Sequence, residues 1–166
     1  MRLYIYKDYK DLYPQLSGSE LTDALIIRAL AEEGQDIRNI SVYRDEQGKP
    51  FVDMACGPCV HVSCSHSHDT FACIVSDVNC GIDIQEKRKV NIVQIADRYF
   101  TTEEKQYVAD YGMDGFFKIW TRREAYAKYT GVGLKQVMSD VSVLNRADVS
   151  FDDSVLDNDM YCSICY

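Results

Sequence analysis

The chain has 166 residues, of which 26 are acidic and 18 basic, giving a net charge of −8. This length suits one compact unit with a single core and is too short for two independent domains of ordinary size. The acidic balance argues against nucleic acid as a partner, since binding to a phosphate backbone needs a basic surface. The start lacks the apolar run of a signal peptide, and no stretch reaches the roughly 18 apolar residues of a membrane span. We therefore expect a cytoplasmic, monomeric protein with no membrane partner.

The predicted elements begin with a strand at 3–6 and an amphipathic helix over about 21–33, which Gly34 ends. The inward face of that helix would carry Leu21, Leu25, Ala29 and Leu30. A strand at 40–43 and a turn over 45–48 follow, and Pro50 fixes the backbone before the next short strand. The segments 60–66 and 71–75 alternate like two paired strands.

In the second half, a strand at 82–85 precedes helices at about 91–99 and 101–111, the later one with a Thr101/Glu104 capped start. The residues from Gly112 to Gly115 break that run before a further helix over 116–129, which Gly131 ends. Segments 141–144 and 149–151 are strand-like, 152–159 reads as an acidic loop, and the last residues as a closing strand. The pseudo-halves, about 1–78 and 79–166, therefore share a similar order of elements.

Seven cysteines include two Cys-x-x-Cys pairs, Cys56 with Cys59 and Cys162 with Cys165. An odd number of cysteines without an export signal favours reduced, buried thiols over a disulfide framework. The two pairs leave open a zinc site, although residues three apart on the predicted closing strand point to opposite faces. A zinc-stabilised interaction domain is thus one alternative.

Polar side chains share one face of the strand at 82–85. Alternation turns Asp83 and Gln85 away from the flanking isoleucines, and the helix at 116–129 stacks Glu124 and Lys128 one turn apart. If the two faces meet, Asp83, Gln85 and Glu124 form an oxygen-rich pocket suited to Mg²⁺. The simpler interpretation is an exposed strand aspartate and an ordinary helix ion pair, worth about 0.2–0.5 kcal/mol.

Two short basic runs, 87–89 and Arg122-Arg123, flank this predicted pocket. On an acidic body such a patch could steer an acidic helix or a polyphosphate toward the pocket. The simpler interpretation of such runs is a solvated loop.

Six motifs follow one another in fixed order: GKP at 48–50, SHS at 65–67, GIDIQ at 81–85, RYFTTEE at 98–104, WTRREAYAK at 120–128 and GVGL at 131–134. Their order and approximate spacing resemble the signature of the 4′-phosphopantetheinyl transferases of the surfactin-synthetase-activating type. The resemblance implies an α+β fold of two similar halves related by a pseudo-twofold axis, with coenzyme A bound in the cleft between them. The chain departs from the pattern at Gln85, where a second metal-binding glutamate is usual, and at Arg123, where lysine is usual.

The resemblance also implies an activity, the transfer of 4′-phosphopantetheine from coenzyme A to a serine of an apo acyl or peptidyl carrier protein with release of 3′,5′-ADP. The implied Mg²⁺ ligands are Asp83, Gln85 and Glu124, and the implied catalytic residues are Glu124 as base, Lys128 as acid, and Asp83. The residues implied to contact coenzyme A are Lys49, Pro50, Ser65, His66 and Lys128. Gln85 leaves open a second alternative, a module that binds coenzyme A or a carrier protein but has lost catalysis.

Overall fold

The structure is a computed structural model that describes residues 1–54, 60–133 and 142–166. Its strands are β1 (Arg2–Lys7), β2 (Ile40–Arg44), β3 (Pro50–Met54), β4 (His61–Ser67), β5 (Thr70–Ser76), β6 (Gly81–Glu86), β7 (Phe151–Leu156) and β8 (Met160–Cys165). Its helices are α1 (Tyr9–Leu12), α2 (Gly18–Glu32), α3 (Ile92–Tyr99) and α4 (Thr102–Thr130), with short 3-10 turns η1 (Ile37–Asn39) and η2 (Asp157–Asp159).

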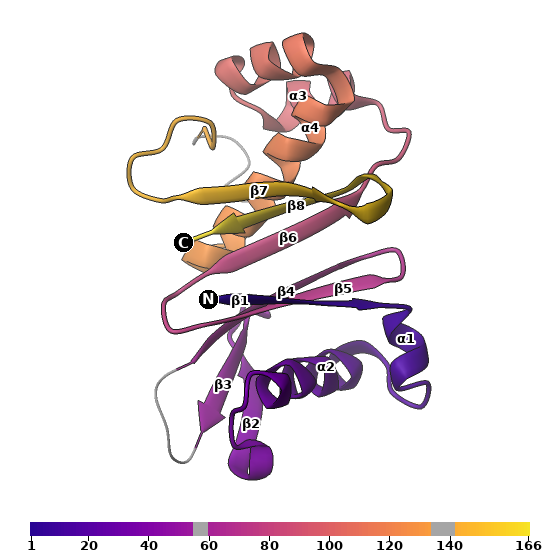
Figure 1. Cartoon of the computed structure of the whole chain (residues 1–166). Coiled ribbons are helices and arrows are strands. Elements are labelled where there is room, and N and C mark those ends of the chain that lie inside the picture. The colour runs from indigo at the N-terminus through magenta and orange to yellow at the C-terminus, as the bar shows by residue number, and fades with distance from the viewer. Residues whose placement is uncertain (55–59, 134–141) are drawn as a thin grey trace.

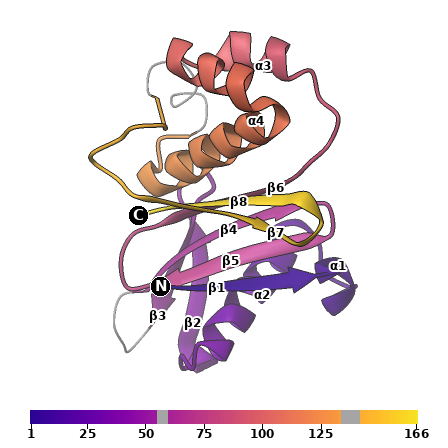
Figure 2. The same ribbon diagram turned by 45° about the horizontal axis from the view of Figure 1, so that its top comes forward.

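Two three-stranded antiparallel sheets lie between the two long helices. The first sheet has the strand order β1-β5-β4 and the second β6-β8-β7, and Figures 1 and 2 show α2 beside the first and α4 beside the second. The sheet faces turned toward each other form one apolar cluster that includes Ile74, Ile82 and Ile84. The predicted α+β class is confirmed, and the pseudo-twofold relation between the halves stays a prediction.

Helix α2 forms as the apolar periodicity of its sequence predicts. Its inward residues Leu21, Leu25, Ala29 and Leu30 are buried against the first sheet, which removes apolar surface from water at about 25 cal/mol per Å². Gly34 follows with a φ of 89°, a backbone conformation that favours glycine. The paired strands predicted at 60–66 and 71–75 are β4 and β5.

The helix that carries the predicted site residues begins further back than expected. Thr101 and Glu104 form the predicted capping box, but α4 runs without a loop from there to Thr130. The expected break is a kink at Gly112, whose φ of 59° and ψ of −135° are not helical. Gly131 then ends α4 with a φ of 72°.

The C-terminal segments correct the sequence-based expectation. Residues 142–144 are not a strand; Val143 is buried, and its N–H donates to Oε1 of Glu104 at 2.9 Å. Most of the predicted acidic loop at 152–159 is the edge strand β7, which pairs with β8 along its length. The strand tolerates its acidic residues because Asp153 is paired with cations of α4. The remaining residue of the strand expected at 141–144, Val141, lies outside the described residues.

The cysteines of the described segments carry free thiols: Cys64, Cys73, Cys80, Cys162 and Cys165. All but Cys64 are buried, as expected of reduced structural thiols. Cys56 and Cys59, half of the possible zinc site, lie outside the described residues. In the part of the chain that the structure describes, no helix is both long and apolar enough to cross a bilayer.

Candidate functional site

The edges of the two sheets meet at β4 and β6, where serine side chains join the strands. Ser63 Oγ accepts the N–H of Ile82 at 3.1 Å, and Ser67 Oγ accepts the N–H of Glu86 at 2.9 Å. This seam brings the end of β4 beside the polar face of β6.

Asp83 is the centre of the site, and its side chain is 3% exposed. Its Oδ1 accepts a hydrogen bond from Ser65 Oγ at 2.7 Å and forms an ion pair with Lys128 Nζ at 2.9 Å. Its Oδ2 accepts a hydrogen bond from Gln85 Nε2 at 3.2 Å. Lys128 also donates to the carbonyl oxygen of Ile82 at 2.8 Å. The polar face of β6 therefore meets α4, which is the condition on which the predicted pocket depends.

Glu124 lies one turn before Lys128 on α4 and near Asp83. Burial, and after it the Asp83 carboxylate, raises the pKa of Glu124 to about 7, although Lys128 opposes the shift. Its carboxylate has no hydrogen bond or ion pair with any other described residue. A half-buried carboxylate that has no partner among the described residues and lies close to a second carboxylate is an electrostatic arrangement that a cation would stabilise.

The donor set fits Mg²⁺, which binds oxygen ligands and keeps several of its waters. Asp83 and Glu124 supply carboxylate oxygens, and Gln85 supplies an amide oxygen if its side chain turns. In the described segments no three His, Cys, Asp or Glu side chains form a metal-binding group.

A cavity of about 260 Å³ collects residues from distant motifs. Lys49 and Pro50 of the turn between β2 and β3 line it, together with Glu124 and Lys128 of α4. Ser63 and Cys64 of β4 also line it, as do Gly131 and Gly133 of the loop after α4, while Leu134 lies outside the described residues. A larger cavity of about 720 Å³ lies elsewhere along α4 and contains none of the predicted site residues.

Lys49 ties the turn to the end of α4. Its Nζ donates to Asn79 Oδ1 at 3.0 Å and to the carbonyl oxygen of Tyr129 at 3.3 Å, and burial lowers its pKa. Asn79 Nδ2 donates to the same carbonyl at 2.8 Å. A cation at a helix C-terminus is favourable because unsatisfied carbonyls gather there. The sequence analysis does not predict this role of Asn79. The one sequence feature that could indicate it is the position of Asn79 two residues before Gly81.

Ser65 and His66 lie on opposite faces of β4. Ser65 is buried and points to Asp83, whereas His66 is exposed and its ring centre lies 6.0 Å from that of Tyr9. Neither residue lines the cavity that Lys49 and Lys128 share. Their contacts with coenzyme A stay predictions.

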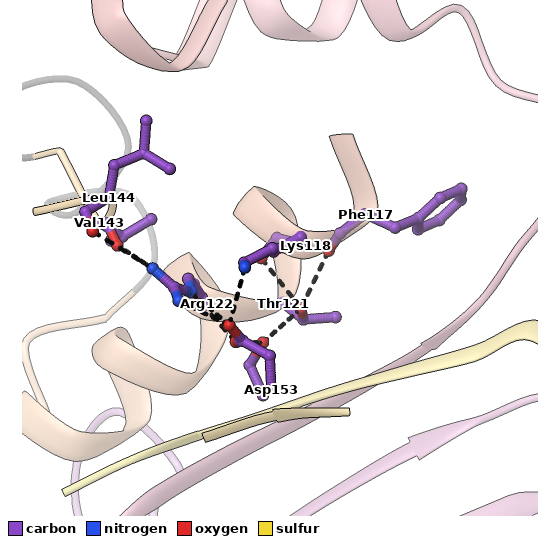
Figure 3. Close-up of polar contacts among 8 residues, drawn as sticks. Phe117, Lys118, Thr121, Arg122, Val143, Leu144 and Asp153 are labelled. Atoms are coloured by element: carbon purple, nitrogen blue, oxygen red, sulfur yellow. Dashed lines mark hydrogen bonds and ion pairs between the residues drawn. The ribbon is translucent and has the colours of Figure 1, made fainter. Parts of the chain in front are cut away.

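A hydrogen-bonded row fixes α4 on the second sheet (Figure 3). Thr121 Oγ1 lies 2.8 Å from Ser163 Oγ, and the Ser163 hydroxyl donates to Asp153 Oδ1 at 2.8 Å. Arg122 binds Asp153 through Nη2 at 2.6 Å and the carbonyl oxygen of Val143 at 2.9 Å. Burial alone would raise the pKa of Asp153, but the Arg122 guanidinium holds that pKa below its ordinary value.

Arg122 and Arg123 therefore do not form the predicted basic patch. The Arg122 side chain is 13% exposed and paired, and that of Arg123 is fully buried against Glu104. Both side chains are covered because α4 has neighbours on more than one side: β7 and residues 143–144 cover Arg122, and Glu104 covers Arg123. In the other run, Lys87 pairs with Asp114 at 2.6 Å, while Arg88 and Lys89 are exposed.

Comparisons with known proteins identify the family of the chain. The family model of the 4′-phosphopantetheinyl transferase superfamily matches residues 79–164, which include β6, α4 and β8. A 4′-phosphopantetheinyl transferase, AcpT, of Salmonella typhimurium is 31% identical over 157 residues, covering 80% of this chain and 78% of that protein. The 4′-phosphopantetheinyl transferase gsp of Aneurinibacillus migulanus is 32% identical over 135 residues, covering 78% of this chain.

The relatives differ from this chain in length. The 4′-phosphopantetheinyl transferase Sfp of Bacillus subtilis (strain 168) is 28% identical over 167 residues, which is 98% of this chain and 71% of that protein. The match covers 53% of the Aneurinibacillus protein and 57% of another Bacillus subtilis transferase. The chain thus spans about half the length of several curated relatives that it matches.

Proposed function

Because the chain belongs to the 4′-phosphopantetheinyl transferase superfamily, we propose that it transfers 4′-phosphopantetheine from coenzyme A to a serine hydroxyl of an apo acyl or peptidyl carrier protein. One observation carries the proposal: Lys49 and Pro50 line the same cavity as Glu124 and Lys128, and Lys128 is paired with the buried Asp83. Residues scattered over half the sequence thus converge on one site. Its carboxylates and cations suit phosphate chemistry.

We propose that Asp83, Glu124 and Gln85 hold Mg²⁺ in this site. The ion would supply positive charge to the pyrophosphate of coenzyme A and so stabilise the charge that develops during phosphoryl transfer. Lys49 and Pro50 would position the nucleotide end of coenzyme A along the cavity wall.

Glu124 is the proposed base. In the metal-free chain the pKa of its half-buried carboxylate is about 7, and a bound cation would keep that carboxylate ionised and so able to accept a proton. The serine oxygen of the carrier protein forms a bond to the β-phosphorus of coenzyme A, the bond from that phosphorus to 3′,5′-ADP breaks, and the serine proton passes to Glu124. The Lys128 ammonium group would face the leaving phosphate, where its positive charge would stabilise that phosphate and it could donate a proton. Because Lys128 is already bound to Asp83, its ammonium group is held in place before the substrate arrives.

The five free thiols of the described segments support a reducing compartment such as the cytoplasm. The partners in this proposal are coenzyme A and an apo carrier protein.

Intact-mass spectrometry tests the proposal. An apo carrier protein incubated with the chain, coenzyme A and Mg²⁺ should gain the mass of one phosphopantetheine, and a chelator should abolish the gain. No gain across several acyl and peptidyl carrier proteins would contradict the proposed activity.

Gln85 favours a second candidate function, a binding module for coenzyme A or a carrier protein without catalysis. Its amide donates to Asp83, so the site has one negative charge fewer than a site with a third carboxylate. Under this alternative the chain would bind coenzyme A in a calorimetric titration and leave carrier proteins unmodified. Gain of transfer activity in Gln85→Glu would then identify the missing charge as the cause.

A further inference from the structure

We propose that Ser65 is a positioning residue for Asp83, so that the metal site on the second sheet depends on a side chain of the first sheet. The inference rests on the proposed function, because it assigns a role within the proposed Mg²⁺ site. It differs from the contact with coenzyme A that the sequence resemblance implies for Ser65. The family match begins at residue 79 and leaves β4 outside it.

The seam between β4 and β6 shows what Ser65 does. The three serines of β4 alternate along the strand, so their side chains share one face. Ser63 and Ser67 each accept a backbone N–H of β6, from Ile82 and Glu86 respectively. By the spacing of these two contacts, Ser65 would face the backbone of Ile84. Instead, its hydroxyl donates to the Asp83 side chain at 2.7 Å.

This hydrogen bond fixes one oxygen of Asp83. Oδ1 accepts from both Ser65 and Lys128, at 2.7 Å and 2.9 Å. Oδ2 accepts only the Gln85 amide among the described residues, at 3.2 Å. The rotation of the carboxylate is therefore set by Oδ1, and Oδ2 is turned toward the other proposed metal ligand, Gln85. Hydrogen bonds that orient a ligand in this way typically account for 10–100-fold in metal affinity.

The chemistry of a hydroxyl separates this role from direct phosphate binding. A serine has one O–H proton to donate, and Ser65 gives it to Asp83. An ionised phosphate oxygen only accepts hydrogen bonds, so Ser65 has no proton left for it while this bond is made. Ser65 is also 8% exposed and does not line the cavity beside Lys128.

Metal binding by the whole chain tests the role without measuring transfer. Mn²⁺ is added to wild type, Ser65→Ala and Ser67→Ala with coenzyme A present, and free Mn²⁺ is followed by its EPR signal. We expect Ser65→Ala to weaken Mn²⁺ binding by about tenfold or more. Ser67→Ala should stay within about twofold of wild type, because it removes a contact between β4 and β6 without touching Asp83. Ser65→Cys keeps the size of the side chain with a weaker donor, and it replaces Ser65→Ala if that variant does not fold.

Two results would overturn the inference. Equal Mn²⁺ affinity in wild type and in the Ser65 variant would show that Asp83 needs no help from Ser65. Equal losses in the Ser65 and Ser67 variants would assign the effect to the contacts between β4 and β6 as a whole. A wild-type chain that binds coenzyme A but no Mn²⁺ would instead contradict the proposed metal site itself, and an isotherm for wild type alone distinguishes that outcome.

Discussion

The backbone of Gly81 rests directly on the backbone of Ala125. A β-carbon at Gly81 would lie 2.0 Å from the carbonyl oxygen of Ala125 and 2.5 Å from the amide nitrogen of Tyr129. No side chain separates the start of β6 from α4, and this close approach is what lets Lys128 reach Asp83 at 2.9 Å.

Gly81→Ala should therefore damage both stability and activity. Relief of the overlap requires α4 to move away from β6, at a cost of about 1–3 kcal/mol in the free energy of unfolding. The same movement would separate Lys128 from Asp83 and lower the transfer rate by at least about tenfold. Gly115→Ala is the matched control: its β-carbon would lie 2.9 Å from that of Tyr111, away from the site, so it should lose stability alone. Urea unfolding and initial transfer rates measure the two effects.

The stability of the metal-free protein should fall as pH rises from about 4.5 to about 7. Glu124 has an ordinary pKa of 4.5 and a pKa of about 7 in the folded chain. The folded state therefore binds the proton more tightly, and the resulting stability is fully present below pH 4.5 and lost as pH rises through 7. Allowing for partial exposure to solvent, we expect a contribution of about 2 kcal/mol. Glu124→Gln should remove this part of the pH dependence in urea unfolding with EDTA, whereas Glu20→Gln, on the exposed side of α2, should keep it.

Arg123 is expected to contribute to folding and not to metal binding. Its guanidinium and the Glu104 carboxylate are both fully buried and paired, so Arg123→Met leaves a buried carboxylate without its cation and should cost about 3 kcal/mol or more. Arg38→Met, which removes a solvent-exposed pair with Asp36, should leave the free energy of unfolding close to that of wild type. The folded Arg123→Met protein should bind Mg²⁺ with wild-type affinity. A weaker affinity in that protein would show that the pair supports the site as well.

Gln85→Glu should tighten Mg²⁺ binding by about tenfold, because a carboxylate replaces an amide beside Asp83. Gln94→Glu adds the same charge on an exposed part of α3 and should leave the affinity unchanged. Calorimetric titration with Mg²⁺ compares the two. If Gln85→Glu bound no more tightly than wild type, Gln85 would not be a metal ligand.

The sequence predicted those parts of the fold in which local chemistry decides the structure. The apolar periodicity of α2, the capping box at Thr101 and the glycine that ends α4 all lie where the pattern indicates. The acidic strand β7 was missed because its stability comes from Arg122, which lies far away in the sequence. A charge run alone predicts solvent exposure.

The site was predictable in part for the same reason. Alternation in β6 and the spacing of Glu124 and Lys128 indicated which side chains share a face, and the structure brings Lys128 to Asp83. The hydrogen bond from Ser65 and the role of Asn79 depend on how the two sheets meet. No local sequence pattern indicates how the two sheets meet.

The most direct test of the central claim is the intact mass of an apo carrier protein after reaction with coenzyme A and Mg²⁺ in the presence of Glu124→Gln or Glu20→Gln protein. The two variants remove the same charge, and circular dichroism confirms that both are folded. The account predicts addition of one phosphopantetheine by Glu20→Gln, as by wild type, and none by Glu124→Gln. Conversion by Glu124→Gln at the wild-type rate would contradict the proposed active site.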